Sequence, residues 1–453
     1  MLAVFGLIIV AGFMTLIMTK KATPFTSLVM VPLIVGIIGA FVLGGYSWTD
    51  IFKFSIAGIT SNADLGITGV AGTAVMLLFA ILYFGLMLAA GLFDPVVNFI
   101  LKVVKGDPLK VLVGTAVLSL AVSVDGDGST TTLVVCSAMI PVYRKLKLKM
   151  MDLAVLIILG NSIMNLLPWG GPTARIITAL HVDEGDLLRR IIPGMILASI
   201  WVIGVSVIRG FAERRRLGIV EISDADMAEV RESQHQGDIA DLARPKAIWF
   251  NLALTIVIMV TLIFGGMWII PKVNSALLFA IGLALAMLVN YGKLADQRRI
   301  IEKYGSSAVQ VIIMVLAAGV FMGVLAGTGM SQAMGQALSD WMPDALGSHW
   351  PLVTAIVSAP GTFLLSNDAF YLGVLPVLNE VGIANGFVAM DMAVASTVGQ
   401  AFHLLSPLVG FIYLLLNLTG VDMGKWQRTS AKWACGTFVL FLLSMFTFGG
   451  IPF

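Results

Sequence analysis

Charged residues are scarce in this chain. Only 12% of its 453 residues are Asp, Glu, Lys or Arg, whereas 58% are hydrophobic. A soluble domain typically carries about 25% charged residues, so this composition excludes a water-soluble fold and predicts an integral membrane protein. The apolar runs lack the period-two alternation of a transmembrane β-barrel, which leaves helices as the spanning elements.

Cysteine and net charge are also low. The two cysteines, Cys136 and Cys435, lie in apolar runs, where we expect small packed side chains rather than redox partners. The net charge of +2 gives no sign of a nucleic-acid partner, and none is expected. The first apolar run has no preceding positive region and no small-residue cleavage site, so it is predicted to be a membrane helix rather than a removed signal.

Ten apolar runs are long enough to cross a bilayer, which takes about 20 helical residues. Two further segments, 109–142 and 351–380, are interrupted by polar residues and are predicted to be re-entrant hairpins, enclosed by protein or a water-filled cavity. The sequence thus predicts an all-α polytopic membrane protein with ten transmembrane helices, two re-entrant hairpins and discontinuous helices at the midplane. The ten runs lie near residues 1–19, 25–45, 69–91, 151–180, 190–209, 247–266, 271–290, 309–328, 387–417 and 430–450.

Lys and Arg residues gather on one side of this topology. With both termini outside, 23 of the 28 basic residues fall on the cytoplasmic side, including those of the polar loop 210–246. Four fall outside, and Arg175 lies within the membrane. Because cytoplasmic loops carry the excess of basic residues, we predict a plasma (inner) membrane protein with external termini and a cytoplasmic linker over 210–246.

The two halves, 1–209 and 247–453, repeat the same order of elements. Each contains three crossings, a hairpin (109–142 or 351–380), a broken helix (151–180 or 387–417) and a last crossing. Pro108 and Pro351 each precede an aspartate by seventeen residues, and Gly160-Asn161 precedes Pro168 by the same spacing as Gly399-Gln400 precedes Pro407. The stretches between these matched features do not align without gaps. An odd number of crossings per half inverts the second half, which is the architecture of secondary transporters with a substrate site near the midplane.

Four polar clusters interrupt the apolar runs and supply the candidate site. Gly and Pro break the helices and free backbone groups, half-helix N-termini favour anions, and carboxylates with freed carbonyls favour cations. The substrate-binding candidates are Arg175, Ser366, Asn367, Thr130, Ser129, Gly170, Gly171, Thr173, Asn165 and Ser406. The candidates for metal or proton coupling are Asp125, Asp127, Asp368 and His403, and the helix breaks are assigned to Pro168 and Pro407.

Ionisable residues inside a membrane are costly, and function is their default interpretation. Each has a structural alternative: the three aspartates as caps of backbone amides, Arg175 as their partner, and His403 as a packed, hydrogen-bonded side chain. A polycarboxylate facing three acids would be repelled unless protons or a divalent metal accompany it. Ser, Asn and backbone oxygens would equally serve a sodium-coupled site, so the charges alone leave the coupling ion open.

These motifs resemble a known family. VDGDGSTT, NLLPWGGPTAR, LLSNDAFYLGVLP and HLLSPLVG are similar, in the same order and across essentially the whole chain, to the citrate–metal–proton symporters of the ion transporter superfamily. The resemblance implies symport of a citrate–metal complex (Mg²⁺ or Ca²⁺ class) with protons, without a permanently bound cofactor. It also implies a site formed by both hairpin tips and both broken helices, a homodimer and an elevator-like movement.

Within that resemblance, Arg175 is expected to hold a citrate carboxylate, while Asp125 and Asp368 reach the metal or carry the proton. The alternative is a Na⁺- or H⁺-coupled transporter of a free di- or tricarboxylate without metal. An enzyme is not expected: an intramembrane aspartyl protease would need acids on separate helices, and the chain has neither a Tyr-Asp pair nor a Pro-Ala-Leu segment.

Overall fold

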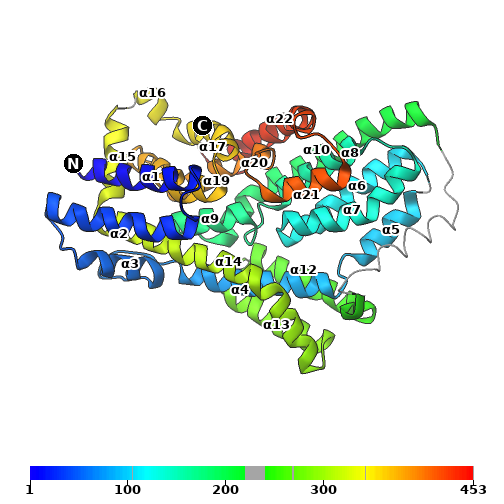
Figure 1. Cartoon of the computed structure of the whole chain (residues 1–453), viewed down its shortest axis with the longest axis horizontal. Coiled ribbons are helices and arrows are strands. Elements are labelled where there is room, and N and C mark those ends of the chain that lie inside the picture. Colours follow the sequence, from blue (N-terminus) through cyan, green and yellow to red (C-terminus); the bar gives the residue numbers. More distant parts are fainter. Residues whose placement is uncertain (105, 220–239, 268–269, 342, 452–453) are drawn as a thin grey trace.

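The computed structural model describes residues 1–104, 106–219, 240–267, 270–341 and 343–451. Apart from one isolated bridge between Asn62 and Ile67, the described backbone consists of helices and loops, which confirms the all-α fold class. Most long helices run along the long axis of the molecule (Figure 1).

The first half contains α1 (Leu2–Met18), α2 (Pro24–Leu43), α3 (Asp50–Thr60), α4 (Ala71–Ala89), α5 (Asp94–Val104), α6 (Pro108–Val122), η1 (Ser123–Asp125), α7 (Gly128–Lys145), α8 (Met150–Met164), α9 (Gly171–Leu180) and α10 (Glu184–Leu217). The second half contains η2 (Ala240–Leu242), η3 (Pro245–Ala247), α12 (Ile248–Phe264), α13 (Ser275–Asn290), α14 (Leu294–Gly327), α15 (Met330–Trp341), α16 (Asp344–Gly347), α17 (Trp350–Leu364), η4 (Ala369–Val374), α18 (Leu375–Ala384), α19 (Ala389–Thr397), α20 (Gln400–His403), α21 (Gly410–Thr419) and α22 (Met423–Thr447).

Seven helical segments in the described residues are long and apolar enough to cross a membrane, which confirms a multi-pass membrane protein. One of them, Pro108–Asp125, is the first arm of a predicted hairpin rather than a predicted crossing. Both predicted hairpins break at their middles, and the run 387–417 forms three short helices. The exact number of crossings therefore stays a prediction.

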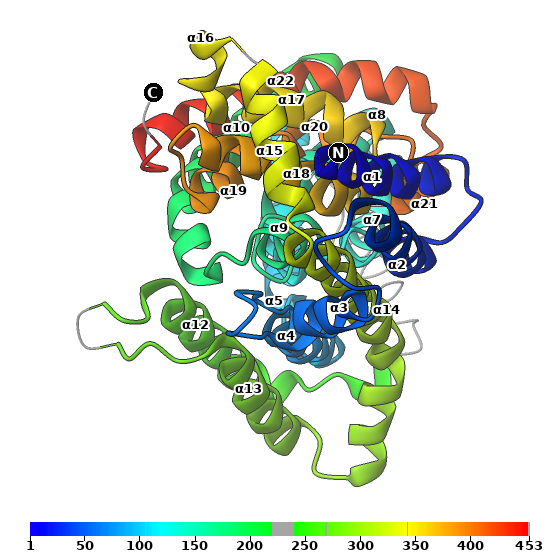
Figure 2. The same ribbon diagram turned by 90° about the vertical axis from the view of Figure 1, so that its left-hand side faces the viewer.

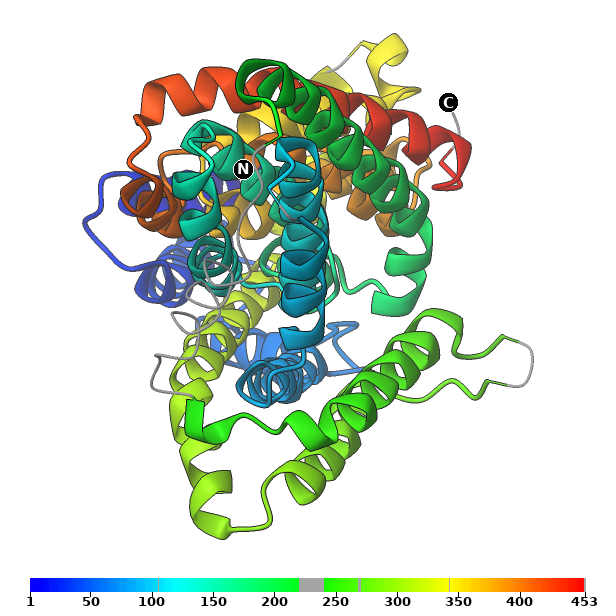
Figure 3. The same ribbon diagram turned by 90° about the vertical axis from the view of Figure 1, so that its right-hand side faces the viewer.

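The helices form two groups, seen end-on in Figure 2. One group, the platform, consists of α2, α3, α4, α13 and α14, which pack on one another. The other, the hairpin body, consists of α6 to α10 and α17 to α22. At the edge, α12 and α13 extend away from the hairpin body (Figures 2 and 3), and only 17% of the α12 span is buried.

Small residues fasten α3 to α14 in the platform. Gly319, Gly323 and Gly327 recur every fourth residue on α14 and face α3. A Cβ atom on Gly323 would lie 2.2 Å from the Phe54 carbonyl oxygen, and one on Gly58 would lie 2.0 Å from the Gly319 oxygen. Since lipid offers no hydrophobic drive for helix association, such close backbone contact is a main source of attraction between these helices.

Helix α10 holds both broken helices, one at each of its ends. Arg209, near its C-terminal end, forms an ion pair with the buried Asp152 in the first turn of α8. Arg190, near its N-terminal end, lies 3.6 Å from Asp391 in the first turn of α19. Nineteen residues of helix span about 28 Å, close to the thickness of the hydrocarbon core. The broken helices thus begin at opposite ends of α10.

The starts of corresponding helices recur at a single separation along the chain. Helices α8, α9 and α10 begin at positions 150, 171 and 184, and their counterparts α19, α21 and α22 begin at positions 389, 410 and 423. Asp183 and Asp422 keep the same separation, and each accepts a backbone hydrogen bond as the N-cap of α10 or α22. Between positions 150 and 184 the correspondence needs no gap, in keeping with the equal spacings from Gly160 to Pro168 and from Gly399 to Pro407 in the sequence.

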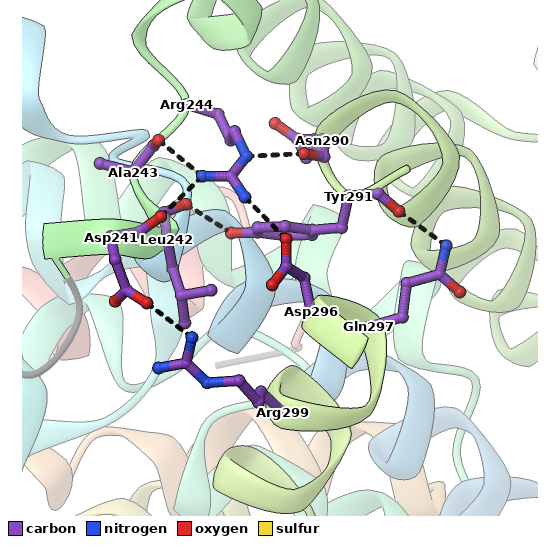
Figure 4. Close-up of polar contacts among 9 residues, drawn as sticks. All are labelled: Asp241, Leu242, Ala243, Arg244, Asn290, Tyr291, Asp296, Gln297 and Arg299. Carbon is purple, nitrogen blue, oxygen red and sulfur yellow. Dashed lines mark hydrogen bonds and ion pairs between the residues drawn. The ribbon is translucent and has the colours of Figure 1, made fainter. Parts of the chain in front are cut away.

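The end of the polar linker is fastened to the corner between α13 and α14 (Figure 4). Arg244 donates to the Asn290 carbonyl, pairs with Asp296 and lies 4.6 Å from the centre of the Tyr291 ring. Its backbone N–H also donates to the carbonyl of Ala90, after α4. This arginine therefore ties the linker to three platform helices, α13, α14 and α4. The neighbouring hydrogen bond from Arg299 holds the pKa of Asp241 below its usual value.

The tight α3–α14 contact gives a first prediction. Gly323→Ala should destabilise the protein by about 1–3 kcal/mol, because its methyl group must push α3 away from α14. Thermal unfolding of the detergent-solubilised protein would show a lower midpoint. The control is Gly305→Ala on the same helix, where a Cβ meets nothing within 4 Å. Equal midpoints for the two variants would contradict close packing at Gly323.

Candidate functional site

An ion pair joins the first broken helix to the second hairpin. Arg175 on α9 places its Nε 2.6 Å from Oδ1 of Asp368, which directly precedes η4. The Arg175 Nη1 donates to the Gly171 carbonyl at 2.7 Å. Both side chains are largely buried, with 23% and 17% of their surfaces exposed. Two predicted site residues, 193 positions apart, therefore meet directly.

The chain breaks between α8 and α9 because the loop LLPWGG cannot continue a helix. Pro168 lacks a backbone N–H group, and Gly170 and Gly171 follow it. Asn165 Oδ1 accepts from the Gly171 N–H at 3.1 Å, and the Thr173 hydroxyl donates to the Leu166 carbonyl at 2.7 Å. These two hydrogen bonds of Asn165 and Thr173 fix the conformation of the loop, which sets the direction of α9 and the position of Arg175.

The tip of the first hairpin rests against this loop. A Cβ on Gly126 would lie 3.0 Å from the Gly170 Cα, so only glycine fits here without a shift. Trp169 Nε1 donates to the Val124 carbonyl at 2.8 Å, and its ring stacks on Phe84 of the platform at 4.8 Å. Because Gly170 adjoins Gly171, contacts run unbroken from the first tip through Arg175 to the second tip.

The two acids of the first tip have different surroundings. Asp127 is the N-cap of α7 and accepts from the N–H groups of Ser129 and Thr130 and from the Thr130 hydroxyl. This arrangement is the capping alternative considered for the aspartates. Asp125 accepts only the Asp127 N–H, at 3.0 Å, and has no ion pair with any described residue. Asp125 is therefore the acid of this tip that is free for a cation.

The second tip continues into the π-helix η4, a conformation that is rare and often marks functional sites. The Ser366 hydroxyl accepts from the Ala369 N–H, as Asp127 accepts from the N–H of Thr130. Ser366 thus corresponds to Asp127, because the two residues are as far apart along the chain as the starts of α8 and α19. The equal seventeen-residue spacings had suggested a different partner for Asp368, namely Asp125.

The second broken helix contributes fewer contacts to this junction. Its break lies between α20 and α21, at residues 404–409, and contains Pro407. The Ser406 hydroxyl accepts from the Leu408 N–H at 3.2 Å within the loop. The buried His403 donates from Nδ1 to the Thr362 carbonyl of α17 at 2.7 Å, as expected of a packed histidine. Neither side chain is hydrogen-bonded to Arg175 or Asp368 in the described structure.

A narrow pocket opens onto the Arg175–Asp368 pair. It lies between α9, the second hairpin and α14, and its volume is at most about that needed for one water molecule. Its walls are otherwise mostly apolar, so the ion pair is its main polar feature. The lining residues are Ala174, Arg175, Thr178, Val311, Met314, Val315, Asp368 and Leu372.

The described residues contain no cluster of three or more Asp, Glu, His or Cys side chains that could hold a metal ion. One or two carboxylates remain, which is the number that protein sites commonly offer to Mg²⁺, with the rest supplied by substrate oxygens and water.

Each broken helix is connected to the hairpin of its own half by one buried side-chain amide. Asn161 of α8 donates to Ser123 and Thr131 of the first hairpin. Gln400 of α20 donates to Asn367 and Tyr371 of the second. Sequence reasoning gave neither residue a role, although the dipeptides Gly160-Asn161 and Gly399-Gln400 precede Pro168 and Pro407 by the same number of residues. That equal spacing indicates that Asn161 and Gln400 occupy corresponding positions in the two halves.

The fold is that of a multi-pass membrane protein, and comparison with known proteins identifies a transporter rather than an enzyme. The model of the citrate transporter family matches residues 8–399. A Bacillus subtilis (strain 168) "Citrate transporter" is 42% identical over the full length of both chains. The "Mg(2+)/citrate complex secondary transporter" of the same organism is 41% identical over 96% of this chain and 95% of that protein. The chain therefore belongs to the citrate transporter family.

A solved structure has the same fold. The Alcanivorax borkumensis YdaH transporter, described as having an unusual topology, matches with a TM-score of 0.62. The match covers 94% of this chain and 98% of that one at 14% sequence identity. It therefore supports the fold alone.

Arg175→Lys tests the ion pair. A lysine offers a single ammonium group and loses the planar fork that serves Gly171 and Asp368 together. We expect the KM for citrate uptake by the reconstituted protein to rise by about tenfold or more, because one hydrogen bond to a charged group is lost. Arg189→Lys, whose partner Asp186 is one turn away near the start of α10, is the matched control. A normal KM for Arg175→Lys would exclude Arg175 as a ligand.

Proposed function

We propose that this protein imports citrate as a complex with a divalent metal ion, in symport with protons. The observation that carries the proposal is the buried pair between Arg175 and Asp368, which contacts through Gly171, Gly170 and Gly126 connect to the hairpin tip that bears Asp125. One guanidinium and two acids from opposing elements provide one site for a carboxylate and two for cations. The similarity to a transporter named for the Mg²⁺–citrate complex supports the choice of cargo.

An exchange of partners couples the two kinds of cargo. A citrate carboxylate binds the Arg175 fork bidentately and displaces Asp368. Breaking a buried ion pair by removing one partner costs about 3–5 kcal/mol, so the displaced carboxylate needs a new cation. The metal of the complex or a proton fills that place, so citrate binding without a cation is unfavourable.

The arrangement of the helices supports an inverted repeat, which we propose spans 1–209 and 247–453 around the linker 210–246. The broken helices begin at opposite ends of α10, and the starts of their parts keep one constant separation along the chain. Each distal half-helix also packs on the hairpin of the other half, α9 on η4 and α21 on α7. Such crossed packing supports the proposal of a shared site between the halves.

Charge placement supports the proposed orientation in the plasma (inner) membrane. Arg209, Arg214, Arg215 and Arg216 lie at the C-terminal end of α10, which the positive-inside rule assigns to the cytoplasm. The linker then begins in the cytoplasm and both termini lie outside. The homodimer stays a prediction.

Metal dependence is the decisive experiment. Purified protein in proteoliposomes, with an alkaline interior, should take up labelled citrate at least about tenfold faster with Mg²⁺ or Ca²⁺ than with EDTA, since the uncompensated charge costs several kcal/mol. Equal uptake in EDTA would refute a metal complex as cargo. Uptake that is metal-independent and stimulated by Na⁺ would instead establish the alternative, a transporter of the free carboxylate.

Asp368→Asn tests the exchange of partners. The neutral amide has no negative charge and cannot bind the proton or the metal ion. We therefore expect citrate accumulation driven by the pH gradient to fall to the level of empty liposomes. Accumulation would be measured against an outward citrate gradient. Asp50→Asn, on the exposed start of α3 beside Lys53, should accumulate normally. Full accumulation by Asp368→Asn would refute a coupling role.

A further inference from the structure

The side chain of Gln400 is buried and its orientation is fixed. Gln400 is 1% exposed. Its Nε2 donates to Asn367 Oδ1 at 3.1 Å and to the Tyr371 hydroxyl at 2.7 Å, and the Tyr371 hydroxyl in turn donates to the Ser396 carbonyl. Both amide hydrogens are therefore used on the second hairpin, and the amide oxygen must point away from these partners.

That oxygen, Gln400 Oε1, is buried and has no hydrogen-bond partner among the described residues. Leaving a buried acceptor unpaired is unfavourable, so a ligand that donates a hydrogen bond here gains affinity. The position matters, since the Asn367 that holds Gln400 directly precedes Asp368. The unpaired oxygen thus belongs to the side-chain network of the proposed cation-binding tip.

The first half repeats this arrangement. Asn161 occupies the position that corresponds to Gln400, at the separation that relates α8 to α19, and it is also 1% exposed. Its Nδ2 donates to the hydroxyls of Ser123 and Thr131 on the first hairpin, at 3.3 and 3.4 Å. Its Oδ1 is likewise buried without a described partner. Two corresponding amides, each bound to its hairpin through nitrogen and unpaired at oxygen, indicate a common use for these oxygens.

The unpaired acceptors need a hydrogen-bond donor from the cargo. Carboxylates of citrate only accept hydrogen bonds. A Mg²⁺ ion bound to citrate keeps several water molecules, held at short and nearly octahedral positions, and these waters donate. Ca²⁺ binds at longer and more variable distances, so a fixed acceptor suits its waters less well.

We infer that Gln400 is a metal-selectivity residue whose Oε1 accepts a hydrogen bond from a water ligand of the incoming metal–citrate complex, with Asn161 in the corresponding role at the first hairpin. This inference rests on the proposed function. It assigns the choice between metals to two neutral amides, while Arg175 and the acids bind charge.

Gln400→Met tests the inference, because methionine keeps the length and apolar volume but removes the acceptor, together with the two amide hydrogens donated to Asn367 and Tyr371. The measurement is kcat/KM for labelled citrate in proteoliposomes with Mg²⁺, Mn²⁺ and Ca²⁺ in turn. We expect the ratio of kcat/KM with Mg²⁺ to kcat/KM with Ca²⁺ to fall by about fivefold, because one hydrogen bond to the Mg²⁺–citrate complex is lost. Asn161→Leu should lower the ratio in the same direction. Gln400→Glu, which retains an acceptor oxygen, should keep the preference for Mg²⁺, and it provides the test if Gln400→Met fails to fold.

Asn379→Leu is the matched control. Asn379 on α18 is also buried with an unpaired Oδ1, but it lies eleven residues beyond Asp368, so its replacement should leave the metal ratio unchanged. The citrate hydroxyl is the other group of the cargo that could donate a hydrogen bond to Gln400. Tricarballylate, which lacks this hydroxyl, distinguishes it from the metal-bound water. A changed citrate/tricarballylate ratio with a constant metal ratio would assign the contact to that hydroxyl and overturn the inference.

The two proposals fail in distinguishable ways. A wild-type protein that transports citrate equally in EDTA would overturn the proposed function and this inference together. A wild-type protein that requires metal, beside Gln400→Met and Asn161→Leu variants with the wild-type metal ratio, would overturn only the role of the amides.

Discussion

The contact between Arg175 and Asp368 is the interaction on which the site depends. It joins the broken helix of one half to the hairpin tip of the other, so neither half alone can form the candidate site. A buried charge without its partner is strongly unfavourable, which explains why two otherwise apolar elements meet at this point. The loop of Pro168, Gly170 and Gly171 and the cap at Asp127 bring the arginine and the tips together.

The surrounding helices keep these elements in place by different means. In the hairpin body, α10 holds the first turns of α8 and α19 through ion pairs at its two ends. In the platform, glycine backbones of α14 contact α3 directly. The two groups meet partly through aromatic rings, where Trp169 lies between Phe84 and Phe279. Aromatic rings can repack without losing specific hydrogen bonds. The contact between the two groups therefore constrains their relative position less than the contacts within each group constrain the helices there.

Much of the fold was predictable because membrane insertion constrains composition strongly. Long apolar runs marked most helices, and polar interruptions marked both hairpins and both broken helices. The short helices α3, α5 and α15 were not predicted, since their amphipathic or mixed sequences lack the apolar length of a crossing. Hydropathy reports which segments enter the membrane but not how they pack.

The candidate site was predicted unevenly for a related reason. Arg175 and Asp368 stood out because charges in apolar runs are costly, and the structure brings them into contact. Asp127 carried the same signal, yet it caps the start of α7 and accepts a hydrogen bond from the Thr130 hydroxyl. A residue type cannot distinguish a ligand from a cap, because both use the same oxygen atoms and only the three-dimensional surroundings differ.

The shared spacing of the two halves has a consequence for how the chain tolerates change. From the start of α8 to that of α10 the halves agree in length while most side chains differ. One inserted residue within a helix turns everything beyond it by about 100°. In α8 it would swing Asn161 off its hairpin while Asp152 stayed in place. Register, more than chemical identity, is therefore the property that this part of the protein must preserve.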